Sequence, residues 1–363
     1  MSRQHRTNRW ITVNIAAMCI LLVSARSYQD QSRLDKQRDK IRSDALKSNP
    51  IPKNGSRLLV QYSFPNENLI DSDIFFGQAV DLCTDSMKRI YVSDASRSAI
   101  FIFDKHGKYI NKIGTRGQGP GELNYPIQVF CDNHDNMYVD DSGNGRVNLY
   151  DKLGLFMRSF RFYRPYFSFI ADYEREYIYA HSPSGNYGEK SLIDILTKDG
   201  KHVGSFGERP RFKNETTTHN SVLLFLDSDN NIYAAWKYFN IIRKYSPGHE
   251  LLREFSVNNK AIKAVATYND NNMITRSDGG TPVKNIYDGL YVYDNVIYLL
   301  KIFPRIEIFA CNDRGDVDRV YWYEYESTSL WKNLIVDKTD RDIKFYLLQT
   351  YPENRVDVFT EMK

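Results

Sequence analysis

A unit of about 40 to 65 residues recurs along this chain and constrains its fold more than any other feature. The segment 89–114, RIYVSDASRSAIFIFDKHGKYINKIG, aligns with 136–160, NMYVDDSGNGRVNLYDKLGLFMRSF. Weaker copies follow, and a tyrosine takes the same place in each unit: Tyr91, Tyr138, Tyr179, Tyr233, Tyr298 and Tyr346. A repeat of this length, with insertions, is typical of the blades of a β-propeller.

Each copy contains four short segments rich in β-branched and aromatic residues, separated by Asp, Asn and Gly turns. The first segments read VDLC, QVFC, SFIA and LLFL. The last copy ends after its third segment, and RLLVQYSF at 57–64 has the pattern of the missing fourth one. Pairing the two ends removes exposed sheet edges. We therefore predict an all-β fold, a six-bladed β-propeller of four-stranded antiparallel blades, closed by an N-terminal strand that completes the last blade.

The glycine-rich stretch at 113–126, IGTRGQGPGELNYP, lies between the fourth strand of one blade and the first strand of the next. A phosphate-binding loop needs a strand before it, a helix after it and free backbone amides, and Pro120 removes one amide. The stretch is therefore interpreted as a turn between blades, in which Gly117, Gly119 and Gly121 let the backbone reverse.

The same region carries a family resemblance. The connector is followed by Asp141, Asn144, Arg146 and Val147 in a D-x-x-N-x-R-V pattern, and together they resemble the NHL-repeat family of six-bladed β-propellers. Two blades carry the pattern clearly and four in outline. The resemblance implies the fold and leaves the function open, because such propellers include lyases, lactonase-like hydrolases and binding scaffolds.

The N-terminus predicts export. Residues 1–25 contain a basic start and an apolar run that ends in Val23-Ser24-Ala25, which indicates a signal peptide or, alternatively, a membrane anchor. Residues 26–56 are polar and are interpreted as a tether, and residues 57–363 form the propeller. We expect a periplasmic or cell-envelope protein, with a single N-terminal membrane anchor as a possible attachment.

Charge and cysteine content point to no particular partner. The formal charge of +4 falls to about +1 if residues 1–25 are removed, which gives no reason to expect nucleic acid. The three cysteines of the remaining chain are too few for a disulfide framework. Cys83 and Cys131 are interpreted as equivalent positions in the first strands of adjacent blades, where the residue type favours small buried apolar groups over a bridge.

Loops on the two faces of the predicted propeller differ in charge. Loops that join fourth to first strands and second to third strands are net positive, including the long insertion 258–287, and the hairpin turns are net negative. Arginine suits carboxylate or sulfate, and flat aromatic faces suit sugar rings. The candidate ligand-binding residues on the positive face are Arg116, Arg164, Arg209, Arg211, Trp236, Tyr238, Arg276 and Arg305. Solvated charges and packing rings are the alternative for each of them.

Neither a catalytic constellation nor a metal site emerges from the sequence. The Asp-rich turns lack the distal Glu of a calcium loop. His181 and His219 are interpreted as surface residues. We expect no catalytic residue, no metal and no cofactor, and we interpret the chain as a non-catalytic propeller that binds an anionic small molecule, a glycan or an envelope protein. The alternative is a metal-dependent hydrolase or lyase acting at the central channel.

Overall fold

The computed structural model describes residues 39–47, 49–52, 55–66, 74–162, 164, 166–182, 191–210, 220–272, 283–325 and 329–362. The chain divides into two units, residues 1–50 with 326–328, and residues 51–325 with 329–363. In the first unit, 39–47 form a helix inside the segment expected to be a tether. The predicted signal peptide or anchor lies outside the described residues. No helix in the described parts of the chain has the length and apolarity to cross a membrane.

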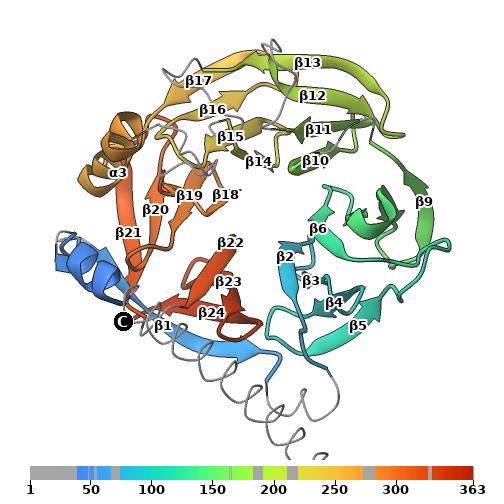
Figure 1. Ribbon diagram of the computed structural model, residues 1–363, viewed down its shortest axis with the longest axis horizontal. Coiled ribbons are helices and arrows are strands. Elements are labelled where there is room, and N and C mark those ends of the chain that lie inside the picture. The colour runs from blue at the N-terminus through green and yellow to red at the C-terminus, as the bar shows by residue number, and fades with distance from the viewer. Residues whose placement is uncertain are drawn as a thin grey trace, which may run out of the picture. The chain divides into compact units, whose positions relative to one another are not determined.

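The second unit is built from antiparallel four-stranded blades arranged around a central channel (Figure 1). The innermost strands of the six blades are β2 (Ala79–Thr84), β6 (Pro126–Cys131), β10 (Ser168–Asp172), β14 (Val222–Leu226), β18 (Gly289–Tyr293) and β22 (Leu330–Lys338). The second strands are β3 (Ile90–Asp94), β7 (Met137–Asp141), β11 (Tyr177–His181), β15 (Ile232–Trp236), β19 (Val296–Lys301) and β23 (Ile343–Tyr351).

The outer strands follow in the same order. The third strands are β4 (Ala99–Phe103), β8 (Arg146–Tyr150), β12 (Ser191–Thr197), β16 (Ile242–Tyr245), β20 (Ile306–Cys311) and β24 (Arg355–Glu361). The fourth strands are β5 (Tyr109–Ile113), β9 (Phe156–Phe160), β13 (His202–Glu208), β17 (Leu251–Phe255), β21 (Val317–Tyr323) and, for the last blade, β1 (Gly55–Phe64). The predicted fold class is confirmed.

Strand β1 closes the ring. It pairs antiparallel with β24 from Leu58 to Phe64, and its first residues pair in parallel with β21 of blade 5. The N-terminal strand therefore supplies the outer strand of blade 6 and also joins that blade to its neighbour. Leu58 is fully buried whereas the next residue, Leu59, is exposed, which is the alternation expected when one face of a strand covers a core.

The six equivalent tyrosines all lie in second strands, where each is buried. Several donate hydrogen bonds from the hydroxyl to the turn that follows an inner strand, such as Tyr91 to the carboxylate of Asp85 at 3.0 Å. Burial raises the pKa of each of the six phenols, so they stay protonated donors at neutral pH. The repeated tyrosine is thus a structural residue of the blade.

The glycine-rich connector is held in place by the D-x-x-N-x-R-V residues. Asp141 accepts the backbone N–H of Asn124 at 2.5 Å and Arg146 Nε at 2.8 Å. The Arg146 guanidinium donates further to the carbonyls of Gly119 and Glu122, at 2.8 and 2.9 Å. These bonds explain why the motif follows the connector, and they support the interpretation of 113–126 as a turn between blades.

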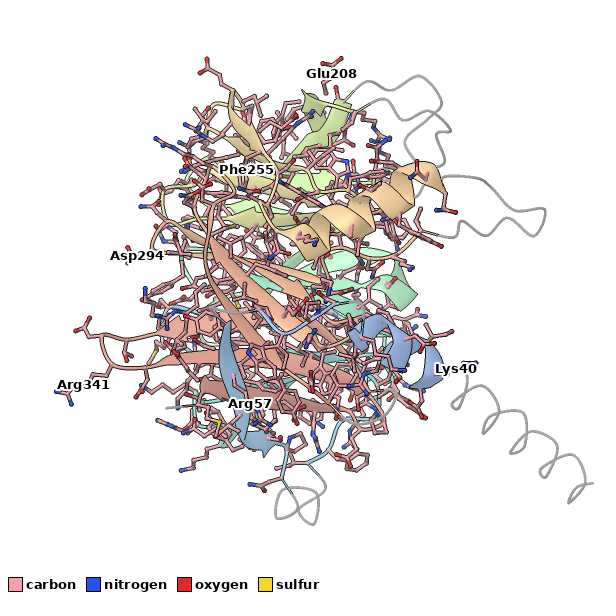
Figure 2. The ribbon with its side chains drawn as sticks, turned by 90° about the vertical axis from the view of Figure 1, so that its left-hand side faces the viewer. Lys40, Arg57, Glu208, Phe255, Asp294 and Arg341 are labelled. Carbon is pink, nitrogen blue, oxygen red and sulfur yellow. The ribbon has the colours of Figure 1, made fainter. Side chains whose placement is uncertain are left out.

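The loop positions also follow the alternation of strands. Asp294 and Arg341 lie in turns between first and second strands, and Figure 2 shows both on the same side of the propeller. In the connection from blade 4 to blade 5, residues expected to be loop form a helix, α3 (Lys260–Asn271). The Asn259 side chain caps it by accepting the N–H groups of Ala261 and Ile262.

Candidate functional site

The innermost strands of all six blades line a channel cavity of about 800 Å³. A volume of this size is that of an ordinary small-molecule site. Inner strands run along the channel, and their pairing with second strands sets the level at which each residue lies. Two levels have different chemistry, and each contains one residue from every blade.

One level is apolar. Its residues are those paired with the six equivalent tyrosines: Cys83, Phe130, Ile170, Phe225, Tyr291 and Ile335. All six line the cavity, and the rings of Phe225 and Tyr291 lie 4.9 Å apart. This belt offers flat apolar surface to a ligand and hydrogen bonds mainly through the Tyr291 hydroxyl.

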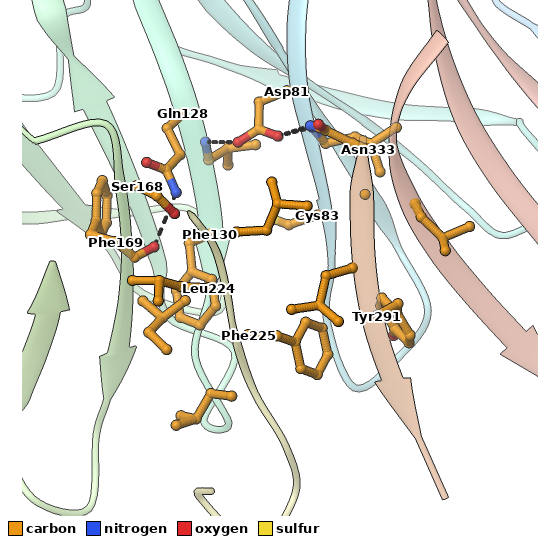
Figure 3. A pocket seen from close by; sticks show the side chains of 18 of the residues that line it. Asp81, Cys83, Gln128, Phe130, Ser168, Phe169, Leu224, Phe225, Tyr291 and Asn333 are labelled. Carbon is orange, nitrogen blue, oxygen red and sulfur yellow. Dashed lines mark hydrogen bonds between the residues drawn. The ribbon is translucent and has the colours of Figure 1, made fainter. Parts of the chain in front are cut away.

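The other level, two residues earlier in each strand, is polar in four consecutive blades (Figure 3). Its members are Asn333, Asp81, Gln128 and Ser168, followed by Leu223 and Gly289. The Asp81 carboxylate accepts the backbone N–H of Val129 at 3.0 Å and a hydrogen bond from the side-chain amide of Asn333. Gln128 donates to the carbonyl of Phe169 at 3.0 Å. The polar belt therefore links blades 6, 1, 2 and 3 across their inner edges.

Three lysines also line the channel, and one of them, Lys88, pairs with Asp337 at 3.8 Å. The other two are Lys332 and Lys237. Lys332 stands beside Asn333 on β22, and Lys237 follows β15. Both are partly buried, and among the described residues neither forms an ion pair within 4 Å. Burial lowers the pKa of Lys332, Asp81 opposes that effect from a longer distance, and the positive charge of Lys237 adds to it. A partly buried ammonium group without a close counter-ion is costly.

The carboxylate of the polar belt titrates in an unusual range. Burial raises the pKa of Asp81 from 3.8 to about 7, although its backbone hydrogen bonds and Lys332 act in the opposite direction. Asp81 can therefore hold or release a proton near neutral pH. The channel thus combines a titratable carboxyl, three lysines, an apolar belt and three further carboxylates, those of Asp85, Asp132 and Asp135.

Four of the residues predicted from the sequence take part in internal contacts or sit away from the channel. Arg164 binds the Asp194 carboxylate through two nitrogens, at 3.0 and 2.5 Å. Arg209 donates to the carbonyls of Ser191 and Ser182. Arg305 is 1% exposed and pairs with Glu324 at 2.9 Å. Arg116 is exposed and donates to the Ser96 carbonyl at 3.0 Å.

The aromatic candidates differ from each other. Trp236 is fully buried, and its indole N–H donates to Asn220 at 3.3 Å, so its ring is not exposed for stacking on a ligand as expected. The reason is tertiary, since Trp236 ends a second strand and packs into the core between blades 3 and 4. Tyr238 is partly buried and lines the channel. Arg211 and Arg276 lie outside the described residues.

His181, interpreted from the sequence as a surface residue, is in fact fully buried at the channel wall. Its Nδ1 donates to the Leu192 carbonyl at 2.9 Å, and burial lowers the pKa of the imidazole to about 4, so the ring is neutral. His219 lies outside the described residues. Among the side chains that the structure describes, no group of three or more His, Cys, Asp or Glu is placed to hold a metal ion.

Asp81, Lys237 and Lys332 were missed by the sequence reasoning. A usable signal existed for Asp81, because a carboxylate in the middle of an otherwise apolar inner strand is unusual. Lys332 could not be found in the same way. Its strand carries a register shift between Lys332 and Ile335. This irregularity interrupts the alternation of side chains that would otherwise indicate which residues lie on which face of the strand.

Comparisons with known proteins support the fold. The model of the DUF5128 family, described as a 6-bladed beta-propeller, matches residues 71–277. A candidate exported protein of Bacteroides fragilis NCTC 9343 has a TM-score of 0.56 and 14% identity over 84% of this chain and 95% of its own. A member of the DUF4221 family from Bacteroides vulgatus ATCC 8482 has a TM-score of 0.56 and 12% identity, over 86% and 99%.

Virginiamycin B lyase from Staphylococcus aureus is also similar, with a TM-score of 0.48 and 11% identity over 84% of this chain and 100% of its own. At these identities the two structures with TM-scores of 0.56 show similarity of fold alone. No curated protein matches the chain.

Proposed function

Because this chain belongs to the DUF5128 family of six-bladed β-propellers, we propose that it is a non-catalytic binding protein whose central channel takes a small anion with an apolar body. The anionic group is held by Lys332 and Lys237, and the body lies against the apolar belt. Residues 1–25 export the protein, residues 26–56 tether it, and it acts in the periplasm or at the cell envelope.

The observation that carries this proposal is the state of the two lysines. Both face an 800 Å³ cavity, both are partly buried, and neither has a carboxylate within 4 Å among the described residues. A ligand anion supplies the missing counter-charge. The cavity lies within the range that encloses small ligands, and its apolar belt adds contact area without charge.

The proposal keeps the anionic ligand expected from the sequence and moves its site. Arg164 and Arg209 are engaged in contacts that hold loops in place, whereas Lys332 and Lys237 are directed at the channel. Tyr238 remains a candidate contact at the channel wall. The NHL-like connector at 113–126 is proposed to stabilise the junction between two blades and not to be part of the binding site.

The test uses two dyes that differ by one anionic group. Anilinonaphthalene sulfonate carries a sulfonate on an apolar phenylnaphthylamine body, and N-phenylnaphthylamine has the same body without the sulfonate. We expect the protein to bind the sulfonate dye more tightly. In the variant K237M/K332M, the affinity for the sulfonate dye falls at least tenfold, or about 1.4 kcal/mol, while affinity for the neutral dye is kept.

Lys112→Met is the matched control, because Lys112 is exposed on β5 and lies outside the channel lining. Fluorescence titration gives both dissociation constants. Equal weakening of both dyes would mean that the substitutions damage the channel, and unchanged binding of both would reject the lysines as the anion site. Either result contradicts the proposal.

Export has its own test. Periplasmic and membrane fractions of cells that express the full chain are separated, and the N-terminus of the recovered protein is sequenced. Recovery in the periplasm with a start near residue 26 supports a cleaved signal, and recovery in membranes with Met1 intact supports an anchor. Cytosolic recovery contradicts both.

A further inference from the structure

Two cysteines of adjacent blades meet in the channel wall. Cys83 on β2 and Cys131 on β6 are free, and their Sγ atoms lie 3.1 Å apart. A disulfide bond is about 2.05 Å long, so the two sulfurs need to approach by about 1 Å. The pairing registers show that the two residues are not equivalent, since Cys83 pairs with Tyr91 whereas Phe130, and not Cys131, pairs with Tyr138.

The two strands are already held side by side. Two residues before Cys83, Asp81 accepts the backbone N–H of Val129, two residues before Cys131, at 3.0 Å. Both cysteines pack at the edge of one apolar cluster between blades 1 and 2. The backbone on each side is therefore fixed by contacts that do not involve sulfur, and side-chain rotation supplies the remaining approach.

Both cysteines also border the channel. Cys83 and Cys131 are partly exposed and line the channel cavity, whereas Cys311 is fully buried in blade 5. We propose that Cys83 and Cys131 form an intramolecular disulfide that joins the innermost strands of blades 1 and 2. This inference does not depend on the proposed ligand.

The oxidant is a disulfide, either a small molecule such as oxidised glutathione or a disulfide-bearing oxidase. One cysteine loses its proton, and the thiolate attacks a sulfur of the external disulfide, which releases one thiol and leaves a mixed disulfide. The second cysteine then attacks the mixed disulfide, the Cys83–Cys131 bond forms, and a second thiol leaves. Two protein thiols lose two protons and two electrons, and the external disulfide gains them.

Burial raises the pKa of the Cys83 thiol, and the nearby carboxylates Asp81 and Asp85 raise it further. Since the thiolate is the attacking species, we expect the bond to form faster as pH rises from about 7 to about 9. The crosslink closes a long loop of chain. The oxidised protein is expected to melt roughly 5 °C higher than the reduced protein.

The experiment treats the full chain, reduced and desalted, with oxidised glutathione at about pH 8.5 and counts free thiols after denaturation. The expected result is the loss of two thiols per molecule, a mass lower by two hydrogens, and a linked peptide containing Cys83 and Cys131. Cys83→Ser and Cys131→Ser abolish the linked peptide. Cys311→Ser is the matched control and keeps it.

Three results would overturn the inference: all thiols retained, a linked peptide that contains Cys311, or stable glutathione adducts on Cys83 and Cys131 without a bond between them. The serine variants are informative as long as they fold, and a cooperative melting transition shows that they do. Denatured, oxidised protein provides a further comparison, because random pairing there gives links to all cysteines and not to one pair.

Discussion

The side-chain amide of Asn333 on β22 donates a hydrogen bond to the carboxylate of Asp81 on β2, across the junction between the last blade and the first. The same carboxylate accepts the N–H of Val129 from blade 2. One channel residue thus joins three blades at the seam where the ring closes. Antiparallel pairing of β1 with β24 closes the outer edge of blade 6. The hydrogen bond between Asn333 and Asp81 joins blade 6 to blade 1 at the inner edge.

The raised pKa of Asp81 predicts a specific pH dependence of stability. Its pKa moves from 3.8 to about 7 on folding, so between these values the folded protein holds a proton that the unfolded chain has released. This stabilising contribution is complete below about pH 4 and is lost as pH rises through 7. Asp81→Asn removes the dependence, and its stability relative to wild type increases from pH 5 to pH 8 by at most about 3 kcal/mol, at about 1.4 kcal/mol for each pH unit between 5 and 7.

Urea unfolding at about pH 5 and about pH 8 measures this difference in stability. Because Asp81 is partly exposed to the channel, solvent screening makes the difference smaller than this upper bound. Asp318→Asn is the control, because that carboxylate is exposed on the outer strand β21. A stability difference between D81N and wild type that is the same at both pH values would contradict the assignment.

Arg146 is expected to be a structural residue of the blade junction. Its guanidinium compensates the fully buried carboxylate of Asp141 and binds two connector carbonyls. Arg146→Ala leaves that carboxylate without its cation, and we expect a loss of about 3 kcal/mol in the free energy of unfolding. The pair of half-buried Arg158 and exposed Asp199 offers the comparison, because we expect Arg158→Ala to cost about 1 kcal/mol or less. Similar losses for both variants would refute this role.

Closure by β1 predicts opposite results at adjacent residues. Leu58 is fully buried in the core of blades 5 and 6, whereas Leu59 is 42% exposed. Leu58→Ala is expected to lower the free energy of unfolding by about 2–5 kcal/mol, and Leu59→Ala to change it by about 0.5 kcal/mol or less. Equal effects in denaturant titrations would show that β1 does not pack as described.

Arg305 is expected to act in stability and not in ligand binding. It is buried beside Glu307, which also binds Lys301 at 2.7 Å. Arg305→Met leaves buried carboxylate charge less compensated, and we expect a loss of about 3 kcal/mol in the free energy of unfolding. Binding of anilinonaphthalene sulfonate to the folded variant should stay within about twofold of wild type. A large loss of dye affinity with unchanged stability would restore Arg305 to the binding site.

Much of the fold was determined by the sequence alone. The repeated tyrosine marks a second strand in every blade, and 57–64 was recognised as the missing strand of the last copy, because blade repeats and strand patterns are local properties of the chain. The helix α3 was missed, since it lies in an insertion that the repeat does not describe. The predicted role of 1–25 as signal peptide or anchor stays a prediction.

The candidate site was decided by tertiary structure. Arginines that look available in loops, such as Arg164, are paired with carboxylates about thirty residues away, and no local pattern reveals such pairing. Lys332 on the inner strand β22 and Lys237 after the second strand β15 are nearly a hundred residues apart. They line one channel because the blades converge on the same axis. Cys83 and Cys131 meet for the same reason. Local periodicity specifies which residues form a blade, but only the closed ring specifies which side chains from different blades face each other.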